Sequence, residues 1–138
     1  MVIMKKLCSL LLMLFALGTL HAQKIVTKPA VEYDTIFTRP TVLASYPGGE
    51  VEWKKYLKKN LKYPRKAWWD EVETEIAVRL IINKDGTIEQ AQHLSMAGYG
   101  FEKEAVRLVL ESGKWLPATY NGTPVKSEGV LKIEFRLK

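Results

Sequence analysis

The segment from Glu75 to Asn83 places the strongest limit on how this chain can fold. Its apolar residues alternate, as in a β-strand with one buried face. The residues on that face are Ile76, Val78, Leu80 and Ile82. The Lys84-Asp85-Gly86 turn that follows is typical of a tight hairpin. We therefore expect a returning strand over Thr87–Leu94. Its less regular apolar pattern indicates a bulge, or an outer strand without a clear apolar face.

Helical spacing appears on both sides of this hairpin. Upstream, one apolar stripe contains Trp53, Tyr56, Leu57 and Leu61. This helix should end before Tyr63, because a proline at position 64 disfavours helical geometry in the residue before it. A short helical turn over Arg65–Glu71 should follow. Downstream, a wider apolar face contains Phe101, Ala105, Leu108 and Val109, and Gly113 is a natural stop for that helix.

The end of the chain predicts a third strand over Val130–Leu137. Its inward residues are Leu131, Ile133, Phe135 and Leu137, and charged residues alternate with them. The preceding stretch, Trp115–Val125, is interpreted as a loop with an Asn121-Gly122 turn. The order helix, strand, strand, helix, strand predicts an α+β fold. In it, two main helices pack on one face of a small antiparallel three-stranded sheet.

The N-terminus has the pattern of a secretory signal peptide. Lys5 and Lys6 precede an apolar run from Leu7 to Leu20, and Ala22 is a small residue before Gln23. The run is shorter than the roughly 20 residues that a membrane-spanning helix needs. We therefore expect a signal peptide at 1–22, an extended arm at 23–44 and a periplasmic domain at 45–138. The alternative is an uncleaved leader that anchors the domain in the inner membrane.

Composition excludes several kinds of site. The single cysteine, Cys8, and one of the 2 histidines, His21, lie in the predicted leader. The mature chain would then have no disulfide and no cysteine-based metal site, and His93 is expected to be structural. No pattern of residues suggests an enzyme or a cofactor. Nucleic-acid binding is not expected either, because the leader directs the chain out of the cytoplasm and no recognition motif is present.

An ordered set of motifs runs through residues 45–138. They are Tyr46-Pro47-Gly48-Gly49, Tyr63-Pro64, the Asp85-Gly86 hairpin, Trp115-x-Pro117, Asn121-Gly122-x-Pro124-Val125 and Phe135-Arg136-Leu137. In this order they resemble the C-terminal domain of TonB, the periplasmic energy transducer of Gram-negative bacteria. The resemblance implies a non-enzymatic protein-binding domain that supports transmembrane transport and needs no metal or cofactor.

The resemblance also implies a binding site. In the family, the last strand pairs with an extended segment of an outer-membrane TonB-dependent receptor. Here the corresponding residues are Val130, Lys132, Glu134 and Arg136. A second contact is implied at Tyr63, Pro64, Arg65 and Lys66. Two alternatives remain open: the strand only closes the sheet or pairs two copies into a homodimer, and the Tyr-Pro segment only separates two helices.

Lysines dominate the polar side of the first predicted helix. They are Lys54, Lys55, Lys58, Lys59 and Lys62. Such a face can contact an acidic receptor surface or lipid headgroups. It can equally be an ordinary solvated helix face, since exposed lysines need no partner.

One departure from the family pattern bears on function. A TonB transducer needs a membrane anchor and a long linker across the periplasm. About 22 residues separate the predicted leader from Ser45, and they reach at most about 75 Å when fully extended. The competing hypothesis is therefore a free-standing envelope adaptor without an energy-transducing role. Such an adaptor would dock onto another envelope protein through its arm or through Trp68 and Trp69.

Overall fold

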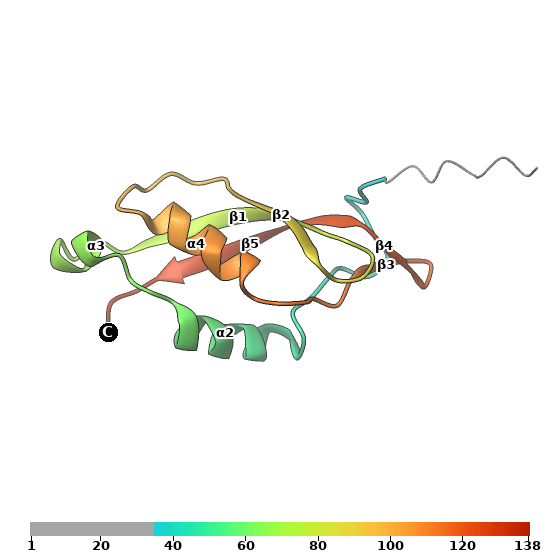
Figure 1. Ribbon diagram of the computed structural model, residues 1–138, viewed down its shortest axis with the longest axis horizontal. Helices are drawn as coiled ribbons and strands as arrows, with labels where there is room; N and C mark the ends of the chain where they lie inside the picture. The colour runs from blue at the N-terminus through green and yellow to red at the C-terminus, as the bar shows by residue number, and fades with distance from the viewer. Residues whose placement is uncertain (1–34) are drawn as a thin grey trace, which may run out of the picture. The chain divides into compact units, whose positions relative to one another are not determined.

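The computed structural model describes residues 35–138, and its elements are shown in Figure 1. They are α2 (Gly49–Asn60), α3 (Arg65–Trp69), β1 (Thr74–Ile82), β2 (Ile88–His93), α4 (Phe101–Leu110), β3 (Ala118–Tyr120), β4 (Thr123–Val125) and β5 (Ser127–Phe135). Strands β2, β1 and β5 form an antiparallel sheet in that order. The predicted α+β fold is confirmed. The predicted signal peptide and most of the predicted arm lie outside the described residues.

Strand β1 is the centre of the sheet, as its apolar pattern predicts. It pairs with β2 on one side and with β5 on the other. Its side chains at Ile76 and Val78 are completely buried, whereas Glu75 on the opposite face is exposed. The sheet therefore has one core face and one solvated face.

The core forms where the two longer helices cover that buried face. Helix α4 contributes Phe101, Ala105, Leu108 and Val109, all without solvent exposure. It packs over β1 and β2, as Figure 1 shows in orange. Helix α2 contributes Trp53, which belongs to the same apolar cluster as Ile133 and Phe135 of β5. The apolar spacing of each helix thus determines which of its faces meets the sheet.

Strand β2 is an outer strand with a bulge. Ile81 pairs with Gln90 and Ile82 pairs with Ile88, so the register shifts by one residue and leaves Glu89 unpaired. A bulge of this kind places one extra residue in a strand and changes the parity of the residues beyond it. It explains why the apolar pattern of this segment is irregular.

The interpretation of Trp115–Val125 as a loop is wrong, because the segment forms the β3–β4 hairpin. Asn121 and Gly122 both have positive φ angles, of 48° and 80°. This is the backbone twist that joins two strands in a two-residue turn. The strands escape sequence analysis because each contains only 3 residues, too few to show an alternation.

The hairpin is extended by Val42 of the predicted arm and by Ser45, which follows the arm. Val42 exchanges two backbone hydrogen bonds with Thr119, at 3.0 Å each. Ser45 pairs in the same way with Leu116. On the other side, the backbone N–H of Trp115 donates to the carbonyl of Gly86 at 2.8 Å, and a Cβ atom at position 86 would lie 2.0 Å from the Trp115 carbonyl oxygen. This close approach explains the glycine in the Asp-Gly turn.

Strands β1 and β2 differ from their predicted ranges by one residue at each end, and two other elements, β5 and α3, differ by more. Strand β5 begins at Ser127 and ends at Phe135, rather than covering Val130–Leu137. Its start is polar and small in sequence, so alternation does not reveal it. The short helix after Pro64 ends at Trp69, because Glu71 adopts a positive φ of 52° that terminates the helical turn.

Candidate functional site

Strand β5 lies at the edge of the sheet, and its backbone orientation is set by one contact. The N–H of Glu128 donates to the carbonyl of Phe37, which lies on the side away from β1. Backbone groups alternate in direction along a strand, and the pairing of β5 with β1 continues without a register shift to Phe135. The N–H and C=O groups of Val130, Lys132 and Glu134 therefore also face away from β1.

These groups form what we call the free edge of β5: the outward backbone of Val130, Lys132 and Glu134. Within residues 35–138, no backbone group pairs with them. The start of the same edge is covered, because the N–H of Phe37 donates to the carbonyl of Lys126 at 2.8 Å. The arm thus limits the accessible edge to the second half of β5, which is the half that the sequence singled out.

The predicted side chains on β5 lie on the solvated face of the sheet. Val130 is 57% exposed. Lys132 pairs with Glu75 of β1 at 3.0 Å, and Arg136 lies 3.6 Å from Glu134. The charges of this face are therefore largely balanced among themselves, and within residues 35–138 it is the outward backbone groups of the strand that have no backbone partner.

Only part of the Tyr63–Lys66 segment is exposed on the surface of the domain. The Tyr63 hydroxyl donates to the carbonyl of Val72 at 2.6 Å, and its ring packs edge-on against Phe101 and Phe135. Burial accordingly raises the pKa of the Tyr63 phenol above its ordinary value. Tyr63 is a packing residue that holds the start of α3 near the end of β5. Arg65 and Lys66 are exposed.

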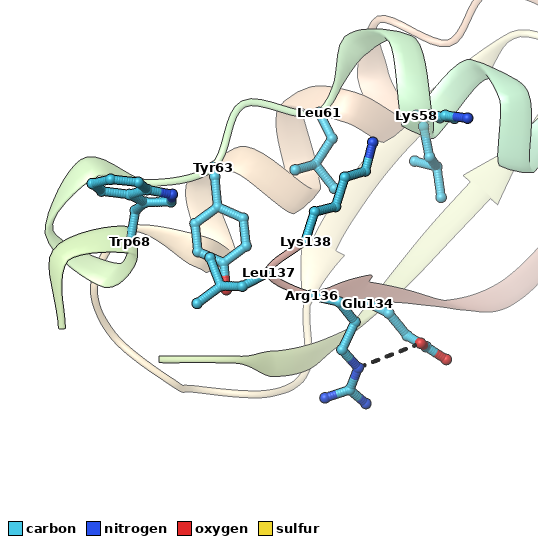
Figure 2. Close-up of a pocket in the computed structure, with 9 residues that line it drawn as sticks. Lys58, Leu61, Tyr63, Trp68, Glu134, Arg136, Leu137 and Lys138 are labelled. Atoms are coloured by element: carbon cyan, nitrogen blue, oxygen red, sulfur yellow. Dashed lines mark ion pairs between the residues drawn. The ribbon is translucent and has the colours of Figure 1, made fainter. Parts of the chain in front are cut away.

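The structure brings Tyr63 of one predicted contact and Glu134 and Arg136 of the other together at one groove (Figure 2), whereas the other five predicted contact residues do not line it. This groove, of about 400 Å³, lies between α2, α3 and the end of β5. It is lined by Leu57, Lys58, Leu61, Tyr63, Trp68, Glu134, Arg136, Leu137 and Lys138. Among the lining residues, Trp68 is expected only as a contact of an adaptor, and the sequence does not predict Leu57, Leu61 or Leu137 as members of a site. No local signal identifies them, because apolar residues of a helix and a strand look like core residues in sequence.

The basic contact face stays a prediction; four of its five lysines lie on α2, and Lys62 follows the helix. Lys54 pairs with Glu50 at 2.7 Å, and Lys55 pairs with Glu52 at 2.6 Å. Lys58 lines the groove beside β5, whereas Lys55 and Lys59 line a different hollow with Tyr46 and Tyr56 on the other flank of the helix. Only one flank therefore faces the predicted binding strand.

One family model matches the chain, that of the Gram-negative bacterial TonB protein C-terminal. The match covers residues 59–137, which is more than half of the chain. The chain belongs to the TonB C-terminal family. The matched range includes the Tyr63–Lys66 segment and all of β5, and it begins inside α2. Comparison with the curated proteins found none that matches.

Membership of the TonB C-terminal family assigns a coarse role. The domains of this family are non-enzymatic interaction domains of the periplasm that act in transport and contact outer-membrane receptors. Among residues 35–138, no helix is both long and apolar enough to cross a membrane. Within the same range, no cluster of potential ligands could hold a metal ion.

An exposed pair of tryptophans distinguishes the far end of this TonB-like domain. Trp68 is 55% exposed and Trp69 is 75% exposed, and their rings meet edge-on at 5.0 Å. They border a second hollow, of about 450 Å³, with Tyr63 and Arg65. Large exposed aromatic side chains are uncommon and often mark an interaction surface.

Proposed function

We propose that this domain binds an extended segment of an outer-membrane receptor by pairing that segment with the free edge of β5, in support of transport. The observation that carries the proposal is the set of backbone groups at Val130, Lys132 and Glu134 that have no backbone partner in the part of the chain that the structure describes. An extended peptide can complete such a ladder as an additional strand. Each backbone hydrogen bond contributes about 0.5–1.5 kcal/mol, so several together give useful affinity.

The organisation of the chain belongs to the same proposal. Residues 1–22 would direct export and be removed, residues 23–44 would form the arm, and residues 45–138 would bind the receptor in the periplasm. The arm has a role here, because Phe37 occupies the first part of the edge and leaves the second part to the receptor.

The test is a proline scan directed by the backbone. Proline lacks an N–H and is tolerated where that N–H makes no ladder bond. Lys132→Pro should therefore stay folded by circular dichroism but lose binding. Lys132→Ala should bind within about tenfold of the wild type, which is about 1.4 kcal/mol. Ile133→Pro is the opposite control, because it removes an N–H that faces β1 and should destabilise the fold.

The probes are overlapping synthetic peptides from the N-terminal periplasmic segments of the TonB-dependent receptors encoded by the same bacterium. Binding is measured by calorimetry with the protein purified from its full-length coding sequence. If Lys132→Pro is folded and binds these peptides as tightly as the wild type, the receptor segment does not use this edge. Gel filtration of the same variant tests the homodimer alternative, since pairing of two copies would be lost with the edge.

The adaptor hypothesis stays as a second candidate because Trp68 and Trp69 are so exposed. An adaptor would dock onto another envelope protein through these rings and would not need the free edge. Trp68→Ala combined with Trp69→Ala should then abolish capture of that protein from envelope extracts, while Lys132→Pro leaves capture unchanged. The receptor hypothesis expects Lys132→Pro to abolish the capture of receptors, whatever the tryptophan variant does to the groove that Trp68 lines.

A further inference from the structure

Helix α2 runs beside the free edge of β5, and two shared hollows and one electrostatic interaction support this placement. Lys54 interacts electrostatically with Glu134 of β5. Lys58 lines the groove together with Glu134 and Arg136. Near the start of the helix, Trp53 borders a hollow with Leu131. The edge therefore has a helix along its core side and solvent on its other side.

A peptide strand added to this edge would present its side chains alternately to these two surroundings. Successive side chains in a strand point to opposite faces of the sheet. Those on the solvated face would lie beside Val130, Lys132 and Glu134. Those on the other face would lie on the side of α2, where Leu131 of β5 borders a hollow with Trp53. Half of the peptide's side chains would thus meet the helix.

The charge at the α2 side of the groove is positive. Figure 2 shows Lys58 and Lys138 on that side and the Glu134–Arg136 pair on the other side of β5. In the described part of the chain, neither Lys58 nor Lys138 forms an ion pair, whereas Lys54 and Lys55 each have a glutamate partner. Glu134, the acid of the groove, is already paired with Arg136 at 3.6 Å.

We propose that Lys58, supported by Lys138, selects a carboxylate side chain on the edge-bound peptide, at a position that faces α2 near the end of β5. The inference rests on the proposed edge pairing and adds a preference to it: an extended peptide with an acidic residue on its helix-facing side. The apolar surfaces of Leu57 and Leu61 beside Lys58 reduce the solvent around such a pair. Charge pairs of this kind contribute more to specificity than to total affinity.

The test uses the receptor peptides of the previous section that bind the wild-type protein. Each acidic residue of a bound peptide is changed in turn to its amide and to lysine. One position should prefer the carboxylate over the amide by about twofold to fivefold, as for partly exposed ion pairs. The preference should weaken in 0.5 M salt, where the screening length falls to a few ångströms.

The matched variants are Lys58→Glu and Lys59→Glu. Both change the net charge equally and lie on the same helix, but only Lys58 lines the groove. Lys58→Glu should weaken binding of the acidic peptide by about tenfold, or about 1.4 kcal/mol, and should favour the lysine-substituted peptide. Lys59→Glu should change binding by less than about twofold. Circular dichroism confirms that both variants are folded.

Three results would overturn the inference, and they are distinguishable. Equal losses in the two variants would indicate general charge attraction. A Lys58→Glu effect on binding to vesicles with phosphatidylglycerol, without one on peptides, would assign the lysine to lipid headgroups. Failure of all peptides to bind the wild type would overturn the edge pairing itself. If Lys132→Pro abolishes binding while Lys58→Glu and Lys59→Glu behave alike, only the acidic preference is wrong.

Discussion

Four aromatic residues meet at the junction of α2, the turn before it and the segment after α4. Tyr46, Trp53 and Trp115 lie in mutual contact, with ring centroids 5.2–5.6 Å apart. Tyr56 stacks on Trp53 at 5.4 Å. Trp115 is only 6% exposed, and its indole N–H donates to the Ser112 hydroxyl at 2.9 Å. A buried indole needs such a partner, and Ser112 supplies it because it follows α4 directly.

Truncating this tryptophan should weaken the fold strongly. Trp115→Ala should lower the free energy of unfolding by about 3–5 kcal/mol, because it removes a large buried side chain and leaves a cavity. Denaturant titration measures the loss. Trp69→Ala is the matched control, since Trp69 is 75% exposed and its loss should change stability by no more than about 0.5 kcal/mol. Similar losses in the two variants would contradict the central role of Trp115.

At the scale of elements, α4 is tied to the end of α2 by charge. The Glu104 carboxylate accepts the backbone N–H of Lys62 at 2.7 Å and also pairs with Arg107. Arg107 in turn donates to the carbonyl of Asn60 at 2.9 Å. These two side chains satisfy backbone groups at the end of α2 that have no partner inside the helix. They therefore help to position the helix that borders the free edge.

This connection should make stability depend on pH. Burial would raise the pKa of Glu104, but hydrogen bonds from Arg107 and from Lys62 outweigh it and hold the pKa below 4.5. A carboxylate whose pKa is lower in the folded state stabilises the fold at pH values above its ordinary pKa. This stabilisation is lost as the pH falls through the folded-state pKa. The free energy of unfolding of the wild type should therefore decrease when the pH is lowered below about 4.5.

The variant that tests this pH dependence is Glu104→Gln. It should be less stable than the wild type at pH 7, and its stability should fall less steeply in acid. Glu71→Gln removes one carboxylate from an exposed position and should keep the steep acid dependence. Denaturant titrations from pH 3 to pH 7 give both curves. Parallel curves for Glu104→Gln and the wild type would show that this carboxylate does not link the two helices.

At the scale of the whole molecule, the first question is whether the leader is removed. Residues 1–34 lie outside the described residues, so the expected cleavage after Ala22 stays a prediction. Mass spectrometry of the exported protein should find a mature N-terminus at Gln23. An intact Met1 in the membrane fraction would instead support an anchored domain, and with it a direct role in energy coupling. A leader variant that places charges within Leu7–Leu20 should block export and serves as a control.

The short connection between leader and domain also bears on the whole molecule. If the leader is cleaved, the TonB-like domain is released into the periplasm and must reach the proposed receptor by diffusion or through another protein. If it is retained, the arm keeps the domain within about 75 Å of the inner membrane. Whether the leader is retained therefore distinguishes energy coupling from adaptor function, whereas edge pairing at β5 is compatible with both.

Several features of this protein were predictable from sequence alone, because they depend on short-range periodicity and turn chemistry. These local features are the alternation of β1, the Asp85-Gly86 turn, the apolar stripes of the two helices and the ordered TonB-like motifs. The bulge in β2 also left a local trace, since one extra residue shifts the parity of the apolar positions.

Other features were decided only by the tertiary structure. Alternation tells which side chains of β5 are buried, but not which backbone groups face outward; that depends on β1 and on Phe37, far away in sequence. Tyr63 and Arg136 line one groove because α3 packs at the end of β5. The lysines of α2 divide between two flanks, because one flank borders the groove beside β5 and the other borders a hollow with Tyr46 and Tyr56. The candidate binding surface arises from such long-range contacts, and these are chosen by the packing of the whole core.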